Sequence, residues 1–289
     1  MQKASERSGG RQRVLTGIGE AWRLASQSVV RLDARLLVEY VANCTHADLM
    51  AHPGRALSAV QFDRLVALVR RRAAGEPLAY LLGSAEFYGR RFLVSPAVLI
   101  PRPDTERLVD LAIERMESLP GPRIVDLGTG SGVVAVTLKC LCPKALITAV
   151  DLSLPALEVA RLNAGRHAAV VRFLAGDWYS PLAEACFDLI VANPPYVAEG
   201  DPHLLQDGLP FEPQTALTDA VAGGDGLACI RAIVGGAARH LYRDGWLLVE
   251  HGYNQAAAVR KMLHQEGFAE VASWHDLSGI ERVSGGRWR

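Results

Sequence analysis

The feature that most constrains the fold is a glycine-rich turn between a short apolar run and a helical pattern. Residues 124–127 read Ile-Val-Asp-Leu, and the chain continues through Gly128, Gly130 and Gly132 into the apolar stretch 133–141. Glycine has no Cβ to block a ligand from the backbone, and a helix that follows presents free N–H groups to an anion. The turn therefore predicts a ligand site at the carboxyl end of a strand.

Further short, β-rich runs alternate with helical stretches after this turn. They cover residues 145–150, 170–174, 187–191 and 246–249. Alternation of this kind predicts a doubly wound, mostly parallel sheet with helices on both faces. We therefore expect an α/β, Rossmann-like domain.

The first part of the chain has helical spacing instead. Apolar residues recur at three-and-four spacing at Leu32, Leu36, Leu37, Tyr40 and Val41, and again at Phe62, Leu65, Val66 and Val69. Ser58 and Gln61 resemble a capping box at a helix start, and Asp104 is placed to cap a later helix. The segment 86–94 alternates around a glycine, which favours a hairpin. We expect a small helical domain over residues 1–85, a hairpin connector over 86–103 and the α/β domain over 104–289.

The charge distribution and the cysteine spacing argue against a metal-binding, exported or membrane protein. The net charge is zero, yet residues 1–103 carry 15 basic and 8 acidic side chains, whereas residues 104–289 carry 16 and 23. The two parts are therefore expected to have different roles. The five cysteines lack the spacing of a zinc site, the start of the chain has no apolar signal core, and no apolar run is long enough to cross a membrane. We expect a cytoplasmic protein with reduced thiols, no metal and no membrane contact.

Asp151 ends the second β-rich run, 19 residues after Gly132. A carboxylate at this place in such a sheet can accept hydrogen bonds from a ribose, or it can cap the helix that begins near Ser153. The spacing here is G-x-G-x-G and Val133 follows Gly132, which disfavours a nicotinamide cofactor, because sites for that cofactor have the spacing G-x-G-x-x-G. Nicotinamide and S-adenosylmethionine both remain open at this point.

The fourth β-rich run leads directly into Asn193, Pro194, Pro195 and Tyr196. Two prolines fix the backbone and leave carbonyl groups without neighbouring N–H donors, while Asn193 adds a side-chain acceptor and Tyr196 a flat aromatic face. This combination suits a planar group that carries an NH₂, either a carboxamide or an aromatic amine. A plain turn with a packed tyrosine is the alternative.

The Asn-Pro-Pro-Tyr tetrapeptide and the glycine turn together resemble the amino-methyltransferases that use S-adenosylmethionine. The chain is most similar to the release factor glutamine methyltransferases, which methylate the glutamine in the Gly-Gly-Gln loop of peptide chain release factors. Residues 87–106, FYGRRFLVSPAVLIPRPDTE, resemble the connector of that family, and a helical domain precedes them as in the family. Similar motifs also fall at Asp177-Trp178, Phe211-Glu212-Pro213, Glu250-His251-Gly252 and Glu281-Arg282-Val283.

The resemblance implies a class I S-adenosylmethionine-dependent fold and a role for each motif. The residues implied to hold the methionine end of the cofactor are Gly128, Thr129, Gly130, Ser131 and Gly132. Asp151 would hold the ribose, and Asp177 and Trp178 would flank the adenine. Asn193 would contact cofactor and substrate, and Pro194, Pro195 and Tyr196 would complete the substrate site. Asn193, Pro194 and Tyr196 are the expected catalytic residues.

Two other classes of function are compatible with these motifs. An adenine methyltransferase for DNA or RNA could hold a flipped base with the same tetrapeptide, although the acidic charge of residues 104–289 disfavours a nucleic acid substrate. A binding module could also keep the scaffold without catalysis. Glu250 and His251 are expected to support the pocket rather than act as a base, and the helical domain is expected to recognise the release factor.

Overall fold

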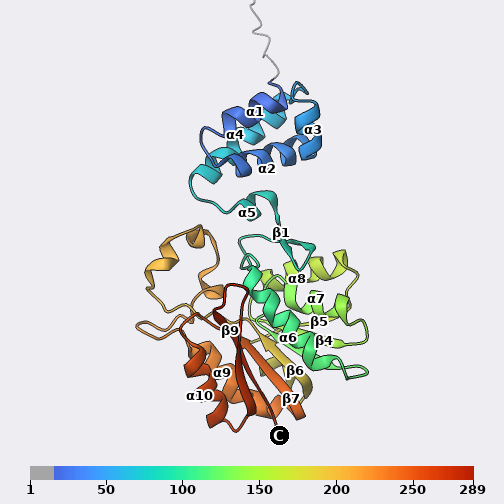
Figure 1. The fold of residues 1–289 in the computed structure, drawn as a ribbon, viewed down its shortest axis with the longest axis vertical. Helices are drawn as coiled ribbons and strands as arrows, with labels where there is room; N and C mark the ends of the chain where they lie inside the picture. The colour runs from blue at the N-terminus through green and yellow to red at the C-terminus, as the bar shows by residue number, and fades with distance from the viewer. Residues whose placement is uncertain (1–15) are drawn as a thin grey trace, which may run out of the picture. The chain divides into compact units, whose positions relative to one another are not determined.

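The protein is described by a computed structural model over residues 16–289, and the expectations for residues 1–15 lie outside the described part. The chain divides between Leu82 and Gly83 into two compact units, each with its own core (Figure 1). None of the helices within residues 16–289 is long and apolar enough to cross a bilayer.

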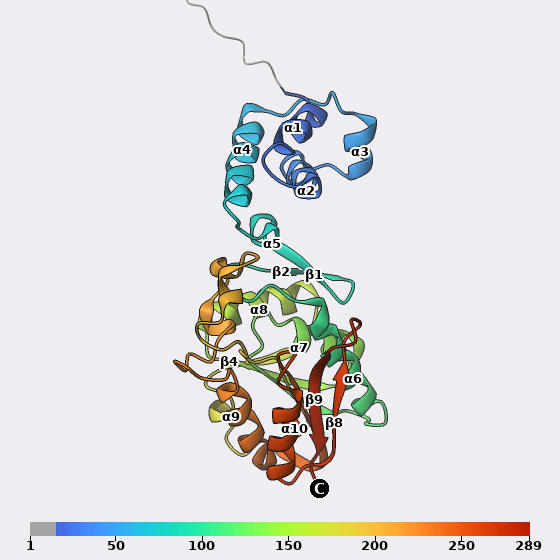
Figure 2. The same ribbon diagram turned by 60° about the vertical axis from the view of Figure 1, so that its left-hand side comes forward.

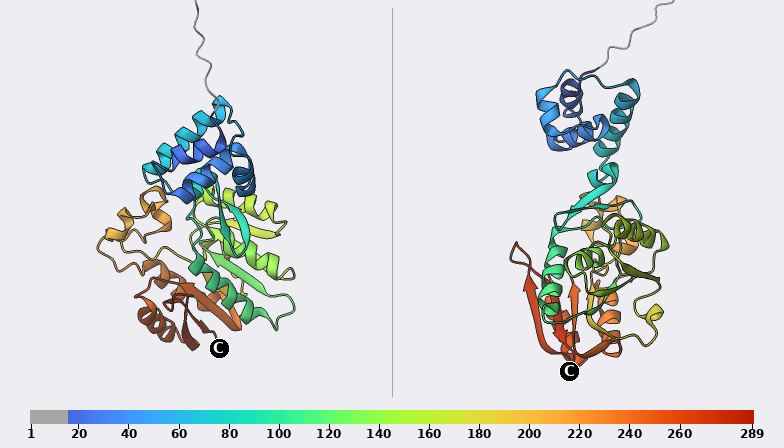
Figure 3. Two further views of the ribbon diagram at one scale, coloured as in Figure 1. Left: turned by 45° about the horizontal axis from the view of Figure 1, so that its top comes forward. Right: turned by 90° about the vertical axis from the view of Figure 1, so that its right-hand side faces the viewer.

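The first unit consists of short helices, drawn in blue and cyan in Figure 3. They are α1 (Ile18–Ala25), α2 (Arg31–Ala42), α3 (His46–Ala51), α4 (Ala59–Ala73) and α5 (Leu78–Leu82). The capping box at the start of α4 is present, because the Ser58 hydroxyl accepts from the Gln61 N–H at 3.2 Å and Gln61 Oε1 accepts from the Ser58 N–H at 2.9 Å. This pairing satisfies N–H groups that would otherwise have no partner in the first turn.

The buried face of α2 differs from the expected one. Leu32 and Tyr40 are 55% and 40% exposed, whereas Ala34, Leu37 and Val38 are fully buried. Both sets of residues have helical spacing, so the sequence pattern fits two overlapping faces. Ala34 and Val38 lie on the face that packs against the rest of the unit, and the larger apolar side chains at 32 and 40 do not.

A β-hairpin opens the second unit (Figure 2). Strands β1 (Ser84–Phe87) and β2 (Arg90–Leu93) pair antiparallel, with Phe87 opposite Arg90. The two residues between them, Tyr88 and Gly89, have φ of +51° and +67°. Positive φ at both central positions is the type I′ geometry, whose twist matches that of the two strands.

The second unit is built on a seven-stranded sheet of order β5-β4-β3-β6-β7-β9-β8. The parallel strands are β3 (Arg123–Leu127), β4 (Leu146–Asp151), β5 (Val171–Ala175), β6 (Phe187–Ala192) and β7 (Leu241–Glu250), and β9 (Glu281–Arg287) pairs antiparallel with both β7 and β8 (Ala269–His275). The expected doubly wound, mostly parallel α/β fold is confirmed.

Helices cover both faces of this sheet (Figure 1). One face packs against α6 (Glu106–Met116), α7 (Val133–Leu141) and α8 (Leu154–Arg166), and the other packs against α9 (Ala228–Ala237) and α10 (Ala256–Gln265). Strand β3 shows why both faces are apolar, since Ile124 belongs to the first core and Val125 to the second.

Two details of the second unit differ from the sequence expectations. Strands β8 and β9 were not among the predicted runs, and in β9 the pair Gly285-Gly286 interrupts the pattern of a strand. A Cβ on Gly285 would lie 2.3 Å from the Leu247 carbonyl oxygen, so close strand packing explains this glycine. The helix-capping role expected for Asp104 is wrong. The helical turn η1 (Pro103–Thr105) begins after Arg102, and Asp104 pairs with Arg282 at 3.3 Å.

Candidate active site

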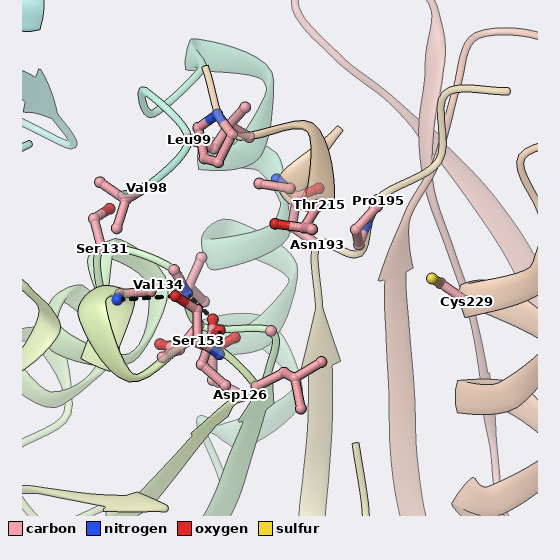
Figure 4. A pocket seen from close by; sticks show the side chains of 18 of the residues that line it. Val98, Leu99, Asp126, Ser131, Val134, Ser153, Asn193, Pro195, Thr215 and Cys229 are labelled. Carbon is pink, nitrogen blue, oxygen red and sulfur yellow. Dashed lines mark hydrogen bonds between the residues drawn. The ribbon is translucent and has the colours of Figure 1, made fainter. Parts of the chain in front are cut away.

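A cavity of about 320 Å³ lies within the second unit at the carboxyl ends of β3, β4 and β6. Figure 4 shows Ser131, Val134 and Ser153 on one side of the cavity and Asn193, Pro195 and Thr215 on the other. This edge is the usual ligand position in open α/β sheets, because the strand order reverses there and leaves a crevice. The volume falls in the range of small-molecule sites.

The glycine turn between β3 and α7 forms one wall of the cavity. Gly128, Gly130 and Gly132 all have positive φ, at +74°, +55° and +80°, and the N–H groups of Gly128 and Thr129 both donate to the Val150 carbonyl at 2.9 Å. A Cβ built on Gly130 meets nothing within 4 Å. The turn therefore exposes backbone to the cavity at Gly130, as expected.

Asp126 lies beneath this turn and is 2% exposed. Its Oδ2 accepts from the Thr129 hydroxyl at 2.6 Å and from the Ala135 N–H at 3.2 Å. Burial raises the pKa of Asp126 to about 7, while the two hydrogen bonds and the nearby Asp151 modify it in opposite directions. The sequence analysis assigned no role to Asp126. Its position as a charged residue within an apolar strand could have indicated one.

Asp151 is already oriented by the backbone around it. Its Oδ2 accepts from the Gly130 N–H at 2.7 Å and its Oδ1 from the Ser153 N–H at 2.8 Å. Burial raises its pKa, and these N–H groups act against that rise. The Ser153 hydroxyl, not Asp151, accepts from the Ala156 N–H and caps α8. The alternative of a simple helix cap therefore does not account for the position of Asp151 beside the cavity.

Asp177 and Trp178 follow β5 and line the same cavity. Trp178 has φ of +44°, which is uncommon for a bulky residue and marks a position held by its surroundings. Its ring lies 3.3 Å from the place that a Cβ on Gly128 would occupy. Trp178 thus packs on the glycine turn and brings an aromatic face to the cavity.

The Asn-Pro-Pro-Tyr tetrapeptide begins where β6 ends. Asn193 and Pro195 line the cavity, whereas the buried Pro194 and the half-buried Tyr196 do not. The Tyr196 hydroxyl points to Glu250 Oε1 at 3.5 Å, and the Tyr196 carbonyl accepts from Gln255 Nε2 at 3.0 Å. Burial raises the pKa of the Tyr196 hydroxyl. Asn193 and Pro195 therefore share one cavity with the glycine turn, whereas the predicted site residues Pro194 and Tyr196 do not line it.

The connector and the segment after the tetrapeptide form the rim of the cavity. Ala97 to Pro101 contribute to it from one side and Pro213 to Ala220 from the other. The buried Glu212 joins the two, because its carboxylate accepts from the Ile100 N–H at 2.9 Å and pairs with the Arg102 guanidinium. The sequence analysis named Glu212 only as part of a family motif. In the structure, this residue links the two segments of the rim.

Two further residues were absent from the sequence expectations. Asn163 of α8 is fully buried and binds Leu93 of the hairpin at both N–H and carbonyl, and it also donates to the Ser131 carbonyl at 2.8 Å. Thr105 lines the cavity and accepts from Asn193 Nδ2 at 3.0 Å. Neither belongs to a short pattern that could have indicated its partner.

Glu250 and His251 at the end of β7 are buried and do not line the cavity. His251 Nε2 lies 2.8 Å from the Ser284 hydroxyl and its Nδ1 2.9 Å from the Gly252 carbonyl. Burial lowers the pKa of His251, which favours the neutral ring. Among residues 16–289, no cluster of three or more metal-binding side chains is found.

The cavity fits S-adenosylmethionine in its chemistry. A backbone wall at Gly130 leaves room for the close approach of a ligand, and the carboxylates of Asp126, Asp151 and Asp177 favour a ligand that carries positive charge. Trp178 supplies an aromatic surface for a base.

Comparison with known proteins agrees with this geometry. The Methyltransferase small domain family matches residues 107–207, and the PrmC N-terminal domain family matches residues 22–83. A release factor glutamine methyltransferase of Bordetella pertussis is 50% identical over 264 residues, which cover 91% of this chain and 97% of that protein. Another from Neisseria gonorrhoeae is 46% identical over 267 residues, covering 92% of this chain and 96% of that protein.

Among solved structures, a T. thermophilus 16S rRNA N2 G1207 methyltransferase in complex with AdoMet and guanosine aligns with a TM-score of 0.53 at 22% identity. The alignment covers 71% of this chain and 50% of that chain, and at this identity it shows the fold alone. The two relatives match nearly end to end and at much higher identity. The chain therefore belongs to the family of release factor glutamine methyltransferases, on a class I S-adenosylmethionine-dependent methyltransferase fold.

Proposed function

We propose that this protein methylates the side-chain amide nitrogen of the glutamine in the Gly-Gly-Gln motif of peptide chain release factors. The observation that carries the proposal is the shared cavity, which Asn193 and Pro195 line together with the glycine turn and Asp151. A planar NH₂ group held at the tetrapeptide would therefore face a ligand held at the turn. S-adenosylmethionine supplies the methyl group, as an electrophilic carbon on a positively charged sulfur.

In this proposal the cofactor is held by the residues named from the sequence. Gly128, Thr129, Gly130 and Ser131, which line the cavity, are proposed to hold its methionine end, and Gly132, which packs against Ala160 and does not line the cavity, completes the turn. Asp151 accepts from the ribose hydroxyls with lone pairs that its two backbone donors leave free. Asp177 and Trp178 flank the adenine.

The substrate side of the proposal follows from the chemistry of an amide. Its nitrogen lone pair is delocalised into the carbonyl group, so the nitrogen attacks poorly unless it is oriented. Asn193 Oδ1 and the Pro194 carbonyl are proposed to accept the two N–H bonds, while Pro195 and Tyr196 support the amide plane. Orientation of this kind can contribute on the order of 7–11 kcal/mol to lowering a bimolecular barrier. The methylated nitrogen is acidic, so water can remove its extra proton.

The partner is proposed from the relatives, which are named for release factors. The helical unit carries the excess of basic side chains and is proposed to contact the release factor beyond the glutamine. A nucleic acid substrate is disfavoured, because residues 104–289 carry 23 acidic and 16 basic side chains and would repel a phosphate backbone.

A mass measurement tests the proposal directly. The protein is incubated with S-adenosylmethionine and a purified release factor, and the peptide that contains Gly-Gly-Gln is examined after proteolysis. We expect the mass of one methylene group to be added at the glutamine. An Asn193→Ala variant should bind the cofactor in calorimetry and yet transfer no methyl group. Transfer to an adenine-containing oligonucleotide, with none to the release factor, would favour the alternative substrate.

A further inference from the structure

The buried side chain of Asn163, on α8, binds two elements of the second unit at once. Its Nδ2 donates to the Ser131 carbonyl of the glycine turn at 2.8 Å and to the Leu93 carbonyl at the end of β2 at 3.0 Å. Its Oδ1 accepts from the Leu93 N–H at 2.7 Å. Asn163 has no exposed surface, so solvent does not replace any of these bonds.

The orientation of the Asn163 amide follows from these partners. Both hydrogens of Nδ2 meet carbonyl oxygens, and Oδ1 meets an N–H group. The reversed amide would place its oxygen against two other oxygens and its NH₂ against a donor. The side chain therefore has one favourable orientation, which fixes the Ser131 carbonyl relative to β2.

The peptide group between Ser131 and Gly132 is held at both ends. Its carbonyl accepts from Asn163, and its N–H donates to the Thr129 carbonyl at 2.8 Å. Gly132 has φ of +80°, and glycine adopts other backbone conformations at little cost. A Cβ on Gly132 would lie 3.0 Å from the Cβ of Ala160, so α8 also packs on the turn one helical turn before Asn163. The bond from Asn163 thus restricts a peptide group that the glycine would leave free to rotate.

Leu93 connects the same side chain to the rim of the cavity. It is the last residue of β2, and the chain continues from it into the connector, whose residues 97–99 line the cavity. Figure 4 shows Val98 of the connector on the same side of the cavity as Ser131. The space between the turn and the rim therefore depends on the two residues that Asn163 joins.

We propose that Asn163 is a positioning residue for the cofactor, which holds the glycine turn and the connector at the spacing that S-adenosylmethionine requires. Asn163 does not itself line the cavity. The inference rests on the proposed function at one point, because that proposal places the methionine end of the cofactor at the turn. Loss of the amide should weaken cofactor binding, while Asn193 and Pro195 on the opposite side of the cavity keep their places.

Replacement of the amide by a carboxylate tests the inference in the full chain. In Asn163→Asp, an oxygen that cannot donate faces the carbonyls of Ser131 and Leu93. The affinity for S-adenosylmethionine, measured by calorimetry, should fall on the order of tenfold or more, as expected when buried polar groups lose their partners. Asn163→Ala leaves space that water can enter and is the milder change. It should weaken binding in the same direction, and it keeps the inference testable where the carboxylate prevents folding.

Gln255 provides a matched control, because it is a second buried amide with the same pattern of partners. It is 7% exposed, and its Oε1 accepts from the Gly252 N–H at 2.8 Å. Its Nε2 donates to the carbonyls of Tyr196 and Asp225 at 3.0 Å and 3.2 Å. Neither Gln255 nor these three partners line the cavity. Gln255→Glu should therefore lower the temperature of unfolding much as Asn163→Asp does, and should keep the affinity for the cofactor.

Hydrogen exchange of the free protein separates this inference from the proposed function. Without cofactor or substrate, the backbone N–H groups of residues 128–134 should exchange faster in the Asn163 variants than in the wild-type protein, and at the wild-type rate in Gln255→Glu. These measurements need no release factor, so a wild-type protein that binds S-adenosylmethionine and methylates no glutamine would contradict the proposed function alone. Unchanged exchange at the turn in the Asn163 variants, or equal cofactor affinities in the Asn163 and Gln255 variants, would overturn the inference.

Discussion

At the scale of single residues, the open side of Gly130 decides how close a ligand can come to the backbone. Its φ is +55°, and the space where a Cβ would stand is free. An alanine would therefore cause two separable effects. The left-handed backbone would strain by about 1–2 kcal/mol, and the new methyl group would project toward the cavity.

We expect Gly130→Ala to fold with a modest loss of stability and to bind S-adenosylmethionine much more weakly. Gly279→Ala is the matched control, because Gly279 has φ of +79° and free space around its Cβ position but does not line the cavity. Thermal unfolding should report a similar loss for both variants, and calorimetry should report weaker binding only for the first. Equal affinities would mean that the cofactor does not approach the turn at Gly130.

At the scale of secondary structure elements, Glu212 joins two segments that would otherwise be independent. It is buried, and it binds the connector at Ile100 and Arg102 from the segment that follows the tetrapeptide. Both segments provide the rim of the cavity. The rim is thus expected to loosen as a whole when this one carboxylate is changed.

Glu212→Gln should lower the free energy of unfolding by about 1.5–3 kcal/mol, the range for a hydrogen bond to a charged group, and should weaken cofactor binding. Arg231→Gln breaks the ion pair between Arg231 and Asp225, whose two side chains are 51% and 53% exposed. This variant should lower the free energy of unfolding by less than about 1 kcal/mol. Denaturant titrations of both variants make the comparison. A larger loss for Arg231→Gln would contradict the role given to Glu212.

The elements also show what the sequence could predict. The strands β3 to β7 and the glycine turn depend on local patterns, and these were placed within a few residues of their bounds, apart from the start of β7. Thr105, Asn163 and Glu212 act on partners 88, 70 and 112 positions away, and no local pattern encodes such pairs. The roles assigned to Asn193 and its neighbours stay predictions, and of the tetrapeptide only Asn193 and Pro195 line the cavity.

At the scale of the whole molecule, the two units have separate cores. The core of the first unit contains residues such as Ile18, Leu37 and Leu65, and the sheet of the second unit is packed between its own helices. The cavity is formed entirely by residues of the second unit.

Residues 83–289 alone are therefore expected to fold and to bind S-adenosylmethionine with the affinity of the full chain. Removal of the helical unit should lower kcat/KM for an intact release factor on the order of tenfold or more, because contacts away from the glutamine are lost. A short Gly-Gly-Gln peptide should react equally well with both proteins. Equal losses on the two substrates would show that the helical unit supports catalysis rather than recognition.

Arg102 illustrates a compromise between helix capping and the pairing that holds the rim of the cavity. It occupies the N-cap of the turn that leads into α6, with extended backbone and no capping bond from its side chain. Serine or aspartate would serve a helix start better by roughly 1 kcal/mol. A redesign guided by helix-capping preferences alone would choose such a residue here and leave the buried Glu212 carboxylate without its guanidinium partner, so the gain at the helix start would be offset by a less stable rim of the active site.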